Sequence, residues 1–213
     1  MQPSHKVRPV FDDPNLVSSA GLVPALRLAE SAGLYELLAG VTVPSPNASA
    51  KAACVVGGML AGADSIDDLD LLRHGGMTRL FGGVRAPSTL GTFLRSFTHG
   101  HVQQLDAVNA ALLAGLAERV PGLLAGGDGF ATVDVDDTVR EVHGHAKQGA
   151  AFGYTRQRGL NIQLATISTP LAAPVIARAR LRSGNTTSAK GAGRLLAQAL
   201  TTARGAGVTG QIL

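Results

Sequence analysis

The chain has 213 residues, of which 45% are hydrophobic, 16% charged and 4% aromatic. This length corresponds to one or two globular domains, and the apolar content excludes a disordered chain. The single cysteine, Cys54, excludes an internal disulfide and a cysteine-based zinc module, so a cytoplasmic chain is expected. No run of about 18 apolar residues occurs, and we therefore expect no membrane partner.

Charge is distributed unevenly along the chain. Residues 1–141 contain ten Lys or Arg and all fifteen Asp or Glu, whereas residues 142–213 contain nine Lys or Arg and no acidic residue. A basic segment without anions suits a polyanion, most simply the backbone of duplex DNA. The alternative is that this basic bias reflects composition alone, because a genome rich in G and C enriches Arg, Ala and Gly throughout a protein.

The first half of the chain is predicted to be helical. Between Ser19 and Leu38, apolar residues recur every three or four positions, which places them on one face of a helix. Further helices are expected at 51–60, 65–73, 88–97 and 101–120. Short helices separated by glycines resemble a helix-turn-helix in outline. In such a motif Arg85 and Arg95 would contact DNA phosphates. Helical packing without any DNA contact accounts equally for this pattern, so both interpretations of residues 1–124 stay open.

The periodicity changes at Phe130. Residues 130–139 alternate apolar and polar side chains and are rich in Val and Thr, which predicts a strand. Two more strands are expected at 160–169 and 174–182, then a helix ending near residue 204 and the start of a fourth strand at 207–213. The pattern predicts an α+β fold with a domain boundary near residue 125 and a β-β-β-α-β order after it.

Three aspartates lie within four positions on the otherwise apolar first strand: Asp134, Asp136 and Asp137. Desolvated carboxylates repel one another unless a cation or hydrogen bonds compensate them. Mg²⁺ prefers oxygen ligands and keeps waters for substrate phosphates, so such a strand is a candidate metal site. Strand alternation places Asp134 and Asp136 on one face and Asp137 on the other. The alternative is a strand that ends in solvent, with Asp137 opening a turn.

The order of the motifs resembles the DDE-type transposases of bacterial insertion sequences, in particular the group 1 DDE transposase domain. The motifs are 133-VDVDDT-138, the glycine-rich hairpin 149-GAAFGYTRQRG-159, 160-LNIQLATIS-168 and 181-LRSGNTTSAKGA-192. The resemblance covers residues 131–213 and implies a ribonuclease-H-like core. In that family an Asp-x-Thr element ends the first strand and carries the first of three metal-binding carboxylates. The match of 136-DDT-138 points to Asp136, with Asp137 as the alternative.

The resemblance also implies the chemistry and the partners. Asp136 and Asp134 would bind metal in a site that holds two Mg²⁺ ions when complete, and the reaction would be DNA strand cleavage and transfer during transposition. The terminal inverted repeats of the element would be held by basic residues, namely Arg156, Arg158, Arg178, Arg180, Arg182 and Lys190. A homodimer associated with the nucleoid is expected for the complete protein.

The sequence departs from the family in its carboxylates. A DDE site needs a second Asp on a later strand and a Glu on a later helix, but no carboxylate follows Glu141. We therefore interpret the chain as a truncated N-terminal part of a transposase, with residues 125–213 forming an incomplete ribonuclease-H-like core. The alternatives are a catalytically inactive DNA-binding transposase fragment and a small α+β domain without a nucleic-acid role.

Overall fold

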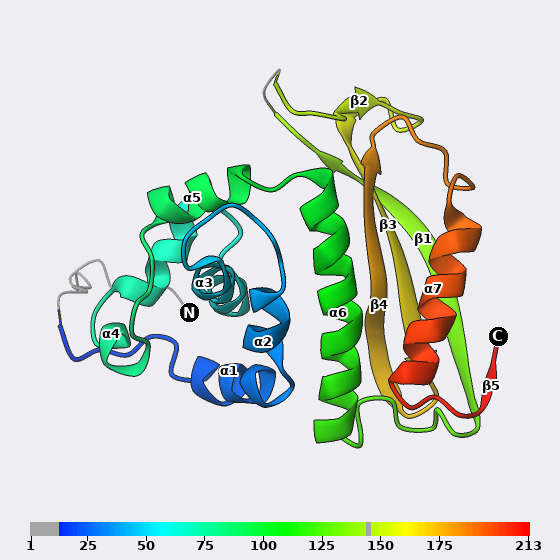
Figure 1. The fold of residues 1–213 in the computed structure, drawn as a ribbon, viewed down its shortest axis with the longest axis horizontal. Coiled ribbons are helices and arrows are strands. Elements are labelled where there is room, and N and C mark those ends of the chain that lie inside the picture. Colours follow the sequence, from blue (N-terminus) through cyan, green and yellow to red (C-terminus); the bar gives the residue numbers. More distant parts are fainter. Residues whose placement is uncertain (1–12, 144–145) are drawn as a thin grey trace, which may run out of the picture. The chain divides into compact units, whose positions relative to one another are not determined.

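A computed structural model of the protein describes residues 13–143 and 146–213 (Figure 1). The fold is mixed α+β, with helices first and a mixed five-stranded sheet after them, as the sequence predicts. Contacts divide the chain into two compact units. The helical unit contains the described residues up to Arg27 and Pro44–Ser96, and the sheet unit contains Leu28–Val43 and Phe97–Leu213.

Seven helices precede the sheet among the described residues. They are α1 (Leu22–Ser31), α2 (Leu34–Ala39), α3 (Ala48–Leu60), the 3₁₀ helix η1 (Asp67–Arg73), α4 (Met77–Leu80), α5 (Pro87–Arg95) and α6 (His99–Arg119). The single helical face predicted between Ser19 and Leu38 is wrong, because the chain breaks at Gly33 into α1 and α2. Gly33 has a φ of 90°, a left-handed conformation that glycine adopts without a steric penalty.

The helical unit has a small core of its own. Leu22, Leu72 and Met77 are buried together, and the fully buried Met77 anchors the short helix α4. The glycines of α3 let η1 approach closely, since a Cβ at Gly58 would overlap the side chain of Leu69. Within the described residues, no helix is both long and apolar enough to cross a membrane.

The four strands and the helix that the sequence predicts in the sheet unit occur in the predicted β-β-β-α-β order, and a further short strand lies between the first and the second of them. These elements are β1 (Phe130–Glu141), β2 (Ala151–Phe152), β3 (Arg158–Thr169), β4 (Ala172–Ser183), α7 (Ala192–Gly205) and β5 (Gln211–Ile212). Strand β3 lies between β1 and β4 and is antiparallel to both, and β5 pairs parallel to β1. The short strand β2, which the sequence does not predict, pairs with the start of β3.

Helices α6 and α7 pack on one face of the sheet, which we call the covered face. Its core contains Leu113 of α6, Leu195 and Ala199 of α7, and Ala165 and Ile167 of β3. Alternate residues of β3 are buried along the whole strand, as expected for a strand with one face against helices. The opposite face, which we call the open face, carries the exposed side chains of β1.

Helix α6 also protects β4, which is an edge strand. The Ala179 amide of β4 donates to Asp106 Oδ1 at 3.2 Å, and Asn109 Nδ2 donates to the Ala177 carbonyl at 3.2 Å. These side chains satisfy backbone groups that would otherwise offer a pairing edge to another chain. Because α6 packs with the sheet in this way, the compact units do not follow the boundary that the change in periodicity suggests near residue 125.

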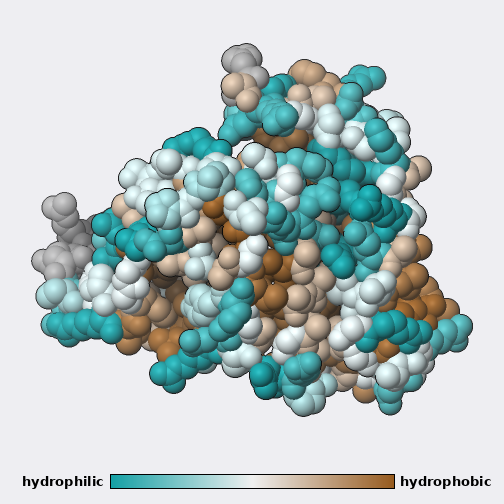
Figure 2. Space-filling model, viewed as in Figure 1, coloured by the Kyte–Doolittle hydropathy of each residue, from teal (hydrophilic) through white to brown (hydrophobic). Residues whose placement is uncertain are grey.

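The edge of the sheet at β5 exposes apolar side chains. Figure 2 shows hydrophobic surface where β5 ends the sheet. Phe130, which pairs with Gln211 of β5, is 45% exposed, and Leu213 is 65% exposed.

Candidate functional site

Strand β1 directs its aspartates to both faces of the sheet. Asp134 and Asp136 are exposed on the open face, whereas Asp137 is partly buried on the covered face. In the register of the sheet, Asp136 lies opposite Leu164 and Asp137 opposite Gln163 of β3. The alternation predicted from the sequence is therefore the one observed, and the neighbours Asp136 and Asp137 have different surroundings.

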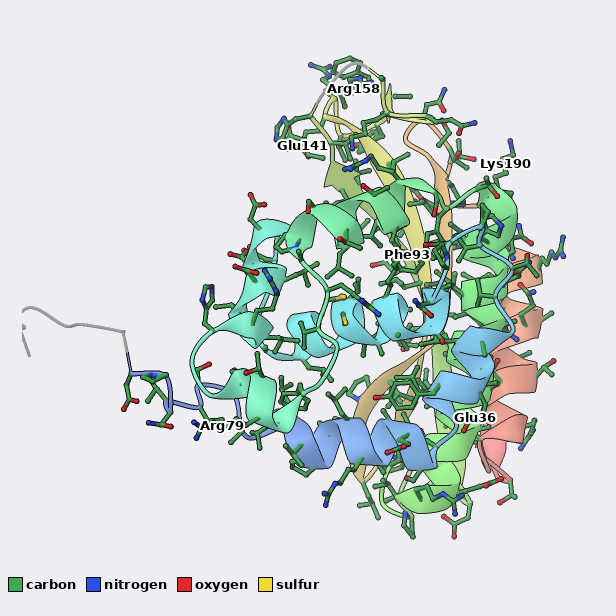
Figure 3. The ribbon with its side chains drawn as sticks, turned by 60° about the vertical axis from the view of Figure 1, so that its left-hand side comes forward. Glu36, Arg79, Phe93, Glu141, Arg158 and Lys190 are labelled. Atoms are coloured by element: carbon green, nitrogen blue, oxygen red, sulfur yellow. The ribbon has the colours of Figure 1, made fainter. Side chains whose placement is uncertain are left out.

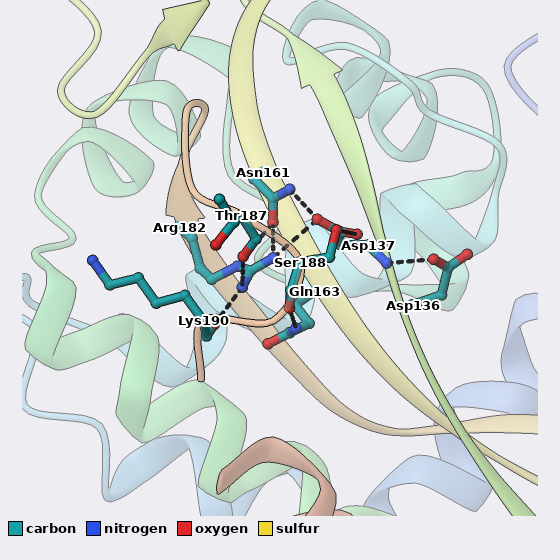
Figure 4. A network of polar contacts seen from close by, with 8 residues as sticks. All are labelled: Asp136, Asp137, Asn161, Gln163, Arg182, Thr187, Ser188 and Lys190. Carbon is teal, nitrogen blue, oxygen red and sulfur yellow. Dashed lines mark hydrogen bonds and ion pairs between the residues drawn. The ribbon is translucent and has the colours of Figure 1, made fainter. Parts of the chain in front are cut away.

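Asp137 belongs to a buried polar network (Figure 4). Its Oδ2 accepts hydrogen bonds from Asn161 Nδ2 at 2.5 Å and from Arg182 Nη2 at 3.0 Å, and its Oδ1 accepts one from Ser188 Oγ at 2.7 Å. Hydrogen bonds from Asn161 and Ser188, together with the Arg182 charge, lower the pKa of Asp137 from its usual value although burial opposes this. Both carboxylate oxygens thus already have donors.

Arg182 connects β4 to the loop that precedes α7. Its Nε and Nη2 donate to Asn161 Oδ1 at 2.8 and 2.6 Å, and its Nη1 donates to the carbonyls of Thr187 at 3.2 Å and Lys190 at 2.6 Å. The Arg182 side chain is only 7% exposed. This guanidinium therefore holds the loop against the sheet.

In this part of β3 the buried side chains are polar and the more exposed ones are apolar, the reverse of the usual pattern. Asn161 and Gln163 are 3% and 1% exposed on the covered face, while the alternate apolar residues such as Ile162 are only half-buried on the open face. Buried amides are tolerated where partners exist, and here Asn161 bonds to Asp137 and Arg182, and Gln163 Nε2 donates to the Ser188 carbonyl at 2.9 Å. Neither residue is among the site residues predicted from the sequence, although two amides at alternate positions of an apolar strand are a visible signal.

Arg178 is also engaged inside the protein. Its Nη1 contacts Asp106 Oδ2 at 2.9 Å, its Nε donates to Thr202 Oγ1 at 2.9 Å, and its side chain is 14% exposed. Arg178, Arg180 and Arg182 share the covered face of β4, as their spacing predicts. Arg178 and Arg182, however, form ion pairs with Asp106 and Asp137. Arg180 donates to uncharged protein groups, so among the described residues of β4 it is the arginine whose charge is not paired with a carboxylate.

A cationic cleft of about 520 Å³ lies between α6, β4 and the start of α7. Arg180, Lys190, Arg194 and His99 line it. Arg180 is held by the Gly191 carbonyl at 3.1 Å and by Gln198 Oε1 at 2.7 Å. Asp106 is the only acidic side chain among the described residues that line the cleft, and it is paired with Arg178.

The start of α7 adds to the positive potential of this cleft. Gly191, which also lines it, precedes α7 with a φ of 81° and no side-chain cap, so the positive end of the helix dipole faces this region uncapped. Arg180 and Lys190 are among the predicted DNA contacts, whereas Arg194 of α7 and His99 of α6 are not, and the fold brings both to the same cleft.

The remaining predicted DNA contacts lie on the hairpin between β2 and β3. Arg156 is exposed in its turn with a φ of 58°, and Arg158 begins β3, where its Nη1 approaches the Val142 carbonyl at 3.5 Å. These residues form a second basic region, apart from the residues that line the cationic cleft.

The metal-binding prediction rests on a pair of carboxylates rather than a full site. Across residues 13–143 and 146–213, no group of three or more His, Cys, Asp or Glu side chains is gathered to hold an ion. Asp134 and Asp136 share the open face, and Asp136 Oδ1 accepts a hydrogen bond from the Asp137 amide at 2.8 Å. Two carboxylates with open surroundings suit Mg²⁺, which completes its shell with water and phosphate oxygens.

Comparisons with known proteins gave no match, either to a family model or to a curated protein.

Proposed function

We propose that this chain is part of a DNA-strand-transferring enzyme of the DDE transposase type, and that its role within residues 1–213 is to bind duplex DNA. One observation supports the proposal most directly: the same sheet unit contains exposed carboxylates on β1 and a cationic cleft at β4. The motif order along β1, the hairpin, β3 and the loop before α7 adds the resemblance to that family.

The carboxylates and the cations have different parts in this proposal. Asp136, with Asp134 two residues before it on the open face, is the candidate for Mg²⁺. Both carboxylate oxygens of Asp137 already accept hydrogen bonds, from Asn161, Ser188 and Arg182. A bound Mg²⁺ would supply Lewis-acid activation at a DNA phosphodiester. The side chains that line the cleft would hold the phosphate backbone, since a cation that neutralises a phosphate releases a counterion on binding.

A second candidate, DNA binding without cleavage, is favoured by one feature of the chain. All of its acidic residues lie at or before Glu141, so the second and third carboxylates of a DDE site have no candidates after β1. The two candidates share DNA binding and differ in metal-dependent cleavage.

DNA binding is tested first, by fluorescence anisotropy with a labelled duplex over a range of salt concentrations. Binding should weaken steeply with salt, and Lys190→Ala combined with Arg194→Ala should reduce the log–log slope by about 2. The matched control is Arg27→Ala combined with Arg79→Ala, which removes the same charge from exposed positions outside the cleft. A chain that binds no duplex, or binds it equally at all salt concentrations, contradicts the proposal.

Cleavage is tested with the same duplex and Mg²⁺ or Mn²⁺. Metal-dependent strand breaks that disappear in Asp136→Asn but persist in a folded Asp137→Asn protein support the enzymatic proposal for this chain. DNA binding without breaks supports the second candidate.

A further inference from the structure

The hairpin that contains β2 exposes two aromatic rings, and we call residues 149–158 the tip hairpin. Phe152 is 67% exposed and Tyr154 is fully exposed. Isolated apolar residues are common on surfaces, but two exposed rings two positions apart on one short hairpin indicate a contact surface. Neither ring has a role in the sheet core or in the cleft.

Cations and a hollow lie beside these rings. Phe152 pairs across the hairpin with Arg158, and Arg156 is exposed in the turn. A hollow of about 360 Å³ is lined by Phe152, Arg156, Gln157 and Glu141, among others. Figure 3 shows Glu141 and Arg158 at the same end of the sheet. The hollow is therefore lined by an aromatic ring, by side chains that can donate and accept hydrogen bonds, and by arginines.

The base of the tip hairpin is held firmly by close backbone packing. The Gly184 amide donates to the Gly149 carbonyl at 3.0 Å, and Ser183 Oγ donates to the same carbonyl at 3.0 Å. A Cβ at Gly184 would overlap the backbone of Gly159, so only glycine permits this contact. A surface with an ordered base loses less conformational entropy when it binds a ligand.

We propose that the tip hairpin binds an unstacked nucleobase of DNA, an inference that rests on the DNA binding proposed above. The exposed ring of Phe152 provides a stacking platform, and Tyr154 provides a second ring at the turn. Every base has a π face, so such stacking tolerates any sequence. Gln157 and Glu141 offer an amide and a carboxylate to a base edge, and Arg156 offers a cation to the adjoining phosphate.

Nucleic acid fits this surface better than a protein partner does. Exposed aromatic rings with arginine also occur at protein interfaces. Here, however, the rings belong to residues 142–213, which carry nine Lys or Arg and no acidic residue. The tip hairpin itself contains Arg156 and Arg158 and no acidic residue, and this local charge favours a polyanion.

The test compares three DNA probes of equal length with the full chain: a perfect duplex, a duplex with one unpaired 2-aminopurine, and a single strand carrying 2-aminopurine. Binding is measured by anisotropy and base stacking by 2-aminopurine fluorescence. The unpaired and single-stranded probes should bind about 10-fold more tightly than the duplex, with quenched fluorescence. Phe152→Ala and Tyr154→Ala should each reduce that preference several-fold, while Phe152→Tyr retains it.

The controls separate this inference from the proposed function. Leu171→Ala truncates another large apolar residue, 77% exposed and outside the tip hairpin, and should leave the preference unchanged. The inference is overturned, and the proposed function is not, if the duplex binds with no preference for unpaired bases. The same holds if the preference is unchanged in both Phe152→Ala and Tyr154→Ala. Failure to bind all three probes overturns both. Self-association abolished by Phe152→Ala, without an effect on DNA, would assign the rings to a protein interface and overturn the inference.

Discussion

The two neighbouring aspartates of β1 give the sharpest test of the site. Asp136→Asn and Asp137→Asn are chemically identical changes at adjacent positions on opposite faces of one strand. Asp136 is exposed, and a surface substitution of this kind changes the free energy of unfolding by no more than about 0.5 kcal/mol. Asp137, by contrast, accepts three hydrogen bonds from Asn161, Arg182 and Ser188.

The size of the Asp137 effect follows from its partners. Asp137→Asn removes the charge opposite Arg182, whose side chain is 7% exposed, and turns an amide NH₂ toward groups that are themselves donors. Breaking a buried ion pair by removing one partner costs about 3 to 5 kcal/mol. Arg182 keeps its bonds to Asn161 and to two carbonyls, so we expect the lower end, about 3 kcal/mol.

Urea unfolding followed by circular dichroism measures both variants. The pH dependence gives a second readout, because the pKa of Asp137 is lowered in the folded protein. Stability from this group is fully present above the usual aspartate pKa near 4, and it is lost as the pH falls through the lower folded value. Asp137→Asn should therefore flatten the acid limb of the stability curve. Equal effects of the two substitutions, or an unchanged acid limb in Asp137→Asn, would refute the assignment of both Asp137 carboxylate oxygens to the buried network.

Three further substitutions test the packing. Asp106→Ala should lower the unfolding free energy by about 3 kcal/mol, since it leaves the charge of Arg178 without its carboxylate and the Ala179 amide of β4 without its acceptor. Light scattering should reveal faster aggregation through the exposed edge. Gly33→Ala should lower the unfolding free energy by about 1 kcal/mol in a urea titration, because alanine is strained at a φ of 90°. Its control is Gly82→Ala, at a position without close neighbours or a positive φ, which should lower the unfolding free energy less. Gly184→Ala should destabilise by about 2 kcal/mol and increase amide exchange in the tip hairpin, because a Cβ there overlaps Gly159.

The sequence predicts the β-β-β-α-β order because period-two alternation and turn residues are local signals. It also predicts the faces of Asp134, Asp136 and Asp137, since a strand fixes them by parity alone. The break at Gly33 is not predicted, because the apolar spacing continues across it and only the left-handed backbone reveals the interruption.

The candidate site is harder to predict, because its partners come from distant parts of the chain. Arg178 and Arg182 are basic residues on a strand, and their spacing alone cannot distinguish a DNA contact from a buried partner. Their partners, Asp106 and Asp137, lie 72 and 45 residues away. The cationic cleft likewise joins His99 of α6 to Arg194 of α7, which only the packing of both helices on the covered face brings about.

The register of the sheet also relates the two parts of the proposed site. Asp137, Gln163 and Arg180 form one row across β1, β3 and β4, so Asp136 and Arg180 are separated by two strand spacings, roughly 10 Å, and point to opposite faces. One phosphate cannot contact both, and a duplex that uses both must extend around the β4 edge. Groups this far apart without shared partners contribute additively, to within about 0.5 kcal/mol. Combining Asp136→Asn with Arg180→Ala should therefore change the duplex binding free energy by the sum of the separate effects. A coupling well above that margin in the anisotropy titration would mean that carboxylate and cation act on the same phosphate, which this register does not allow.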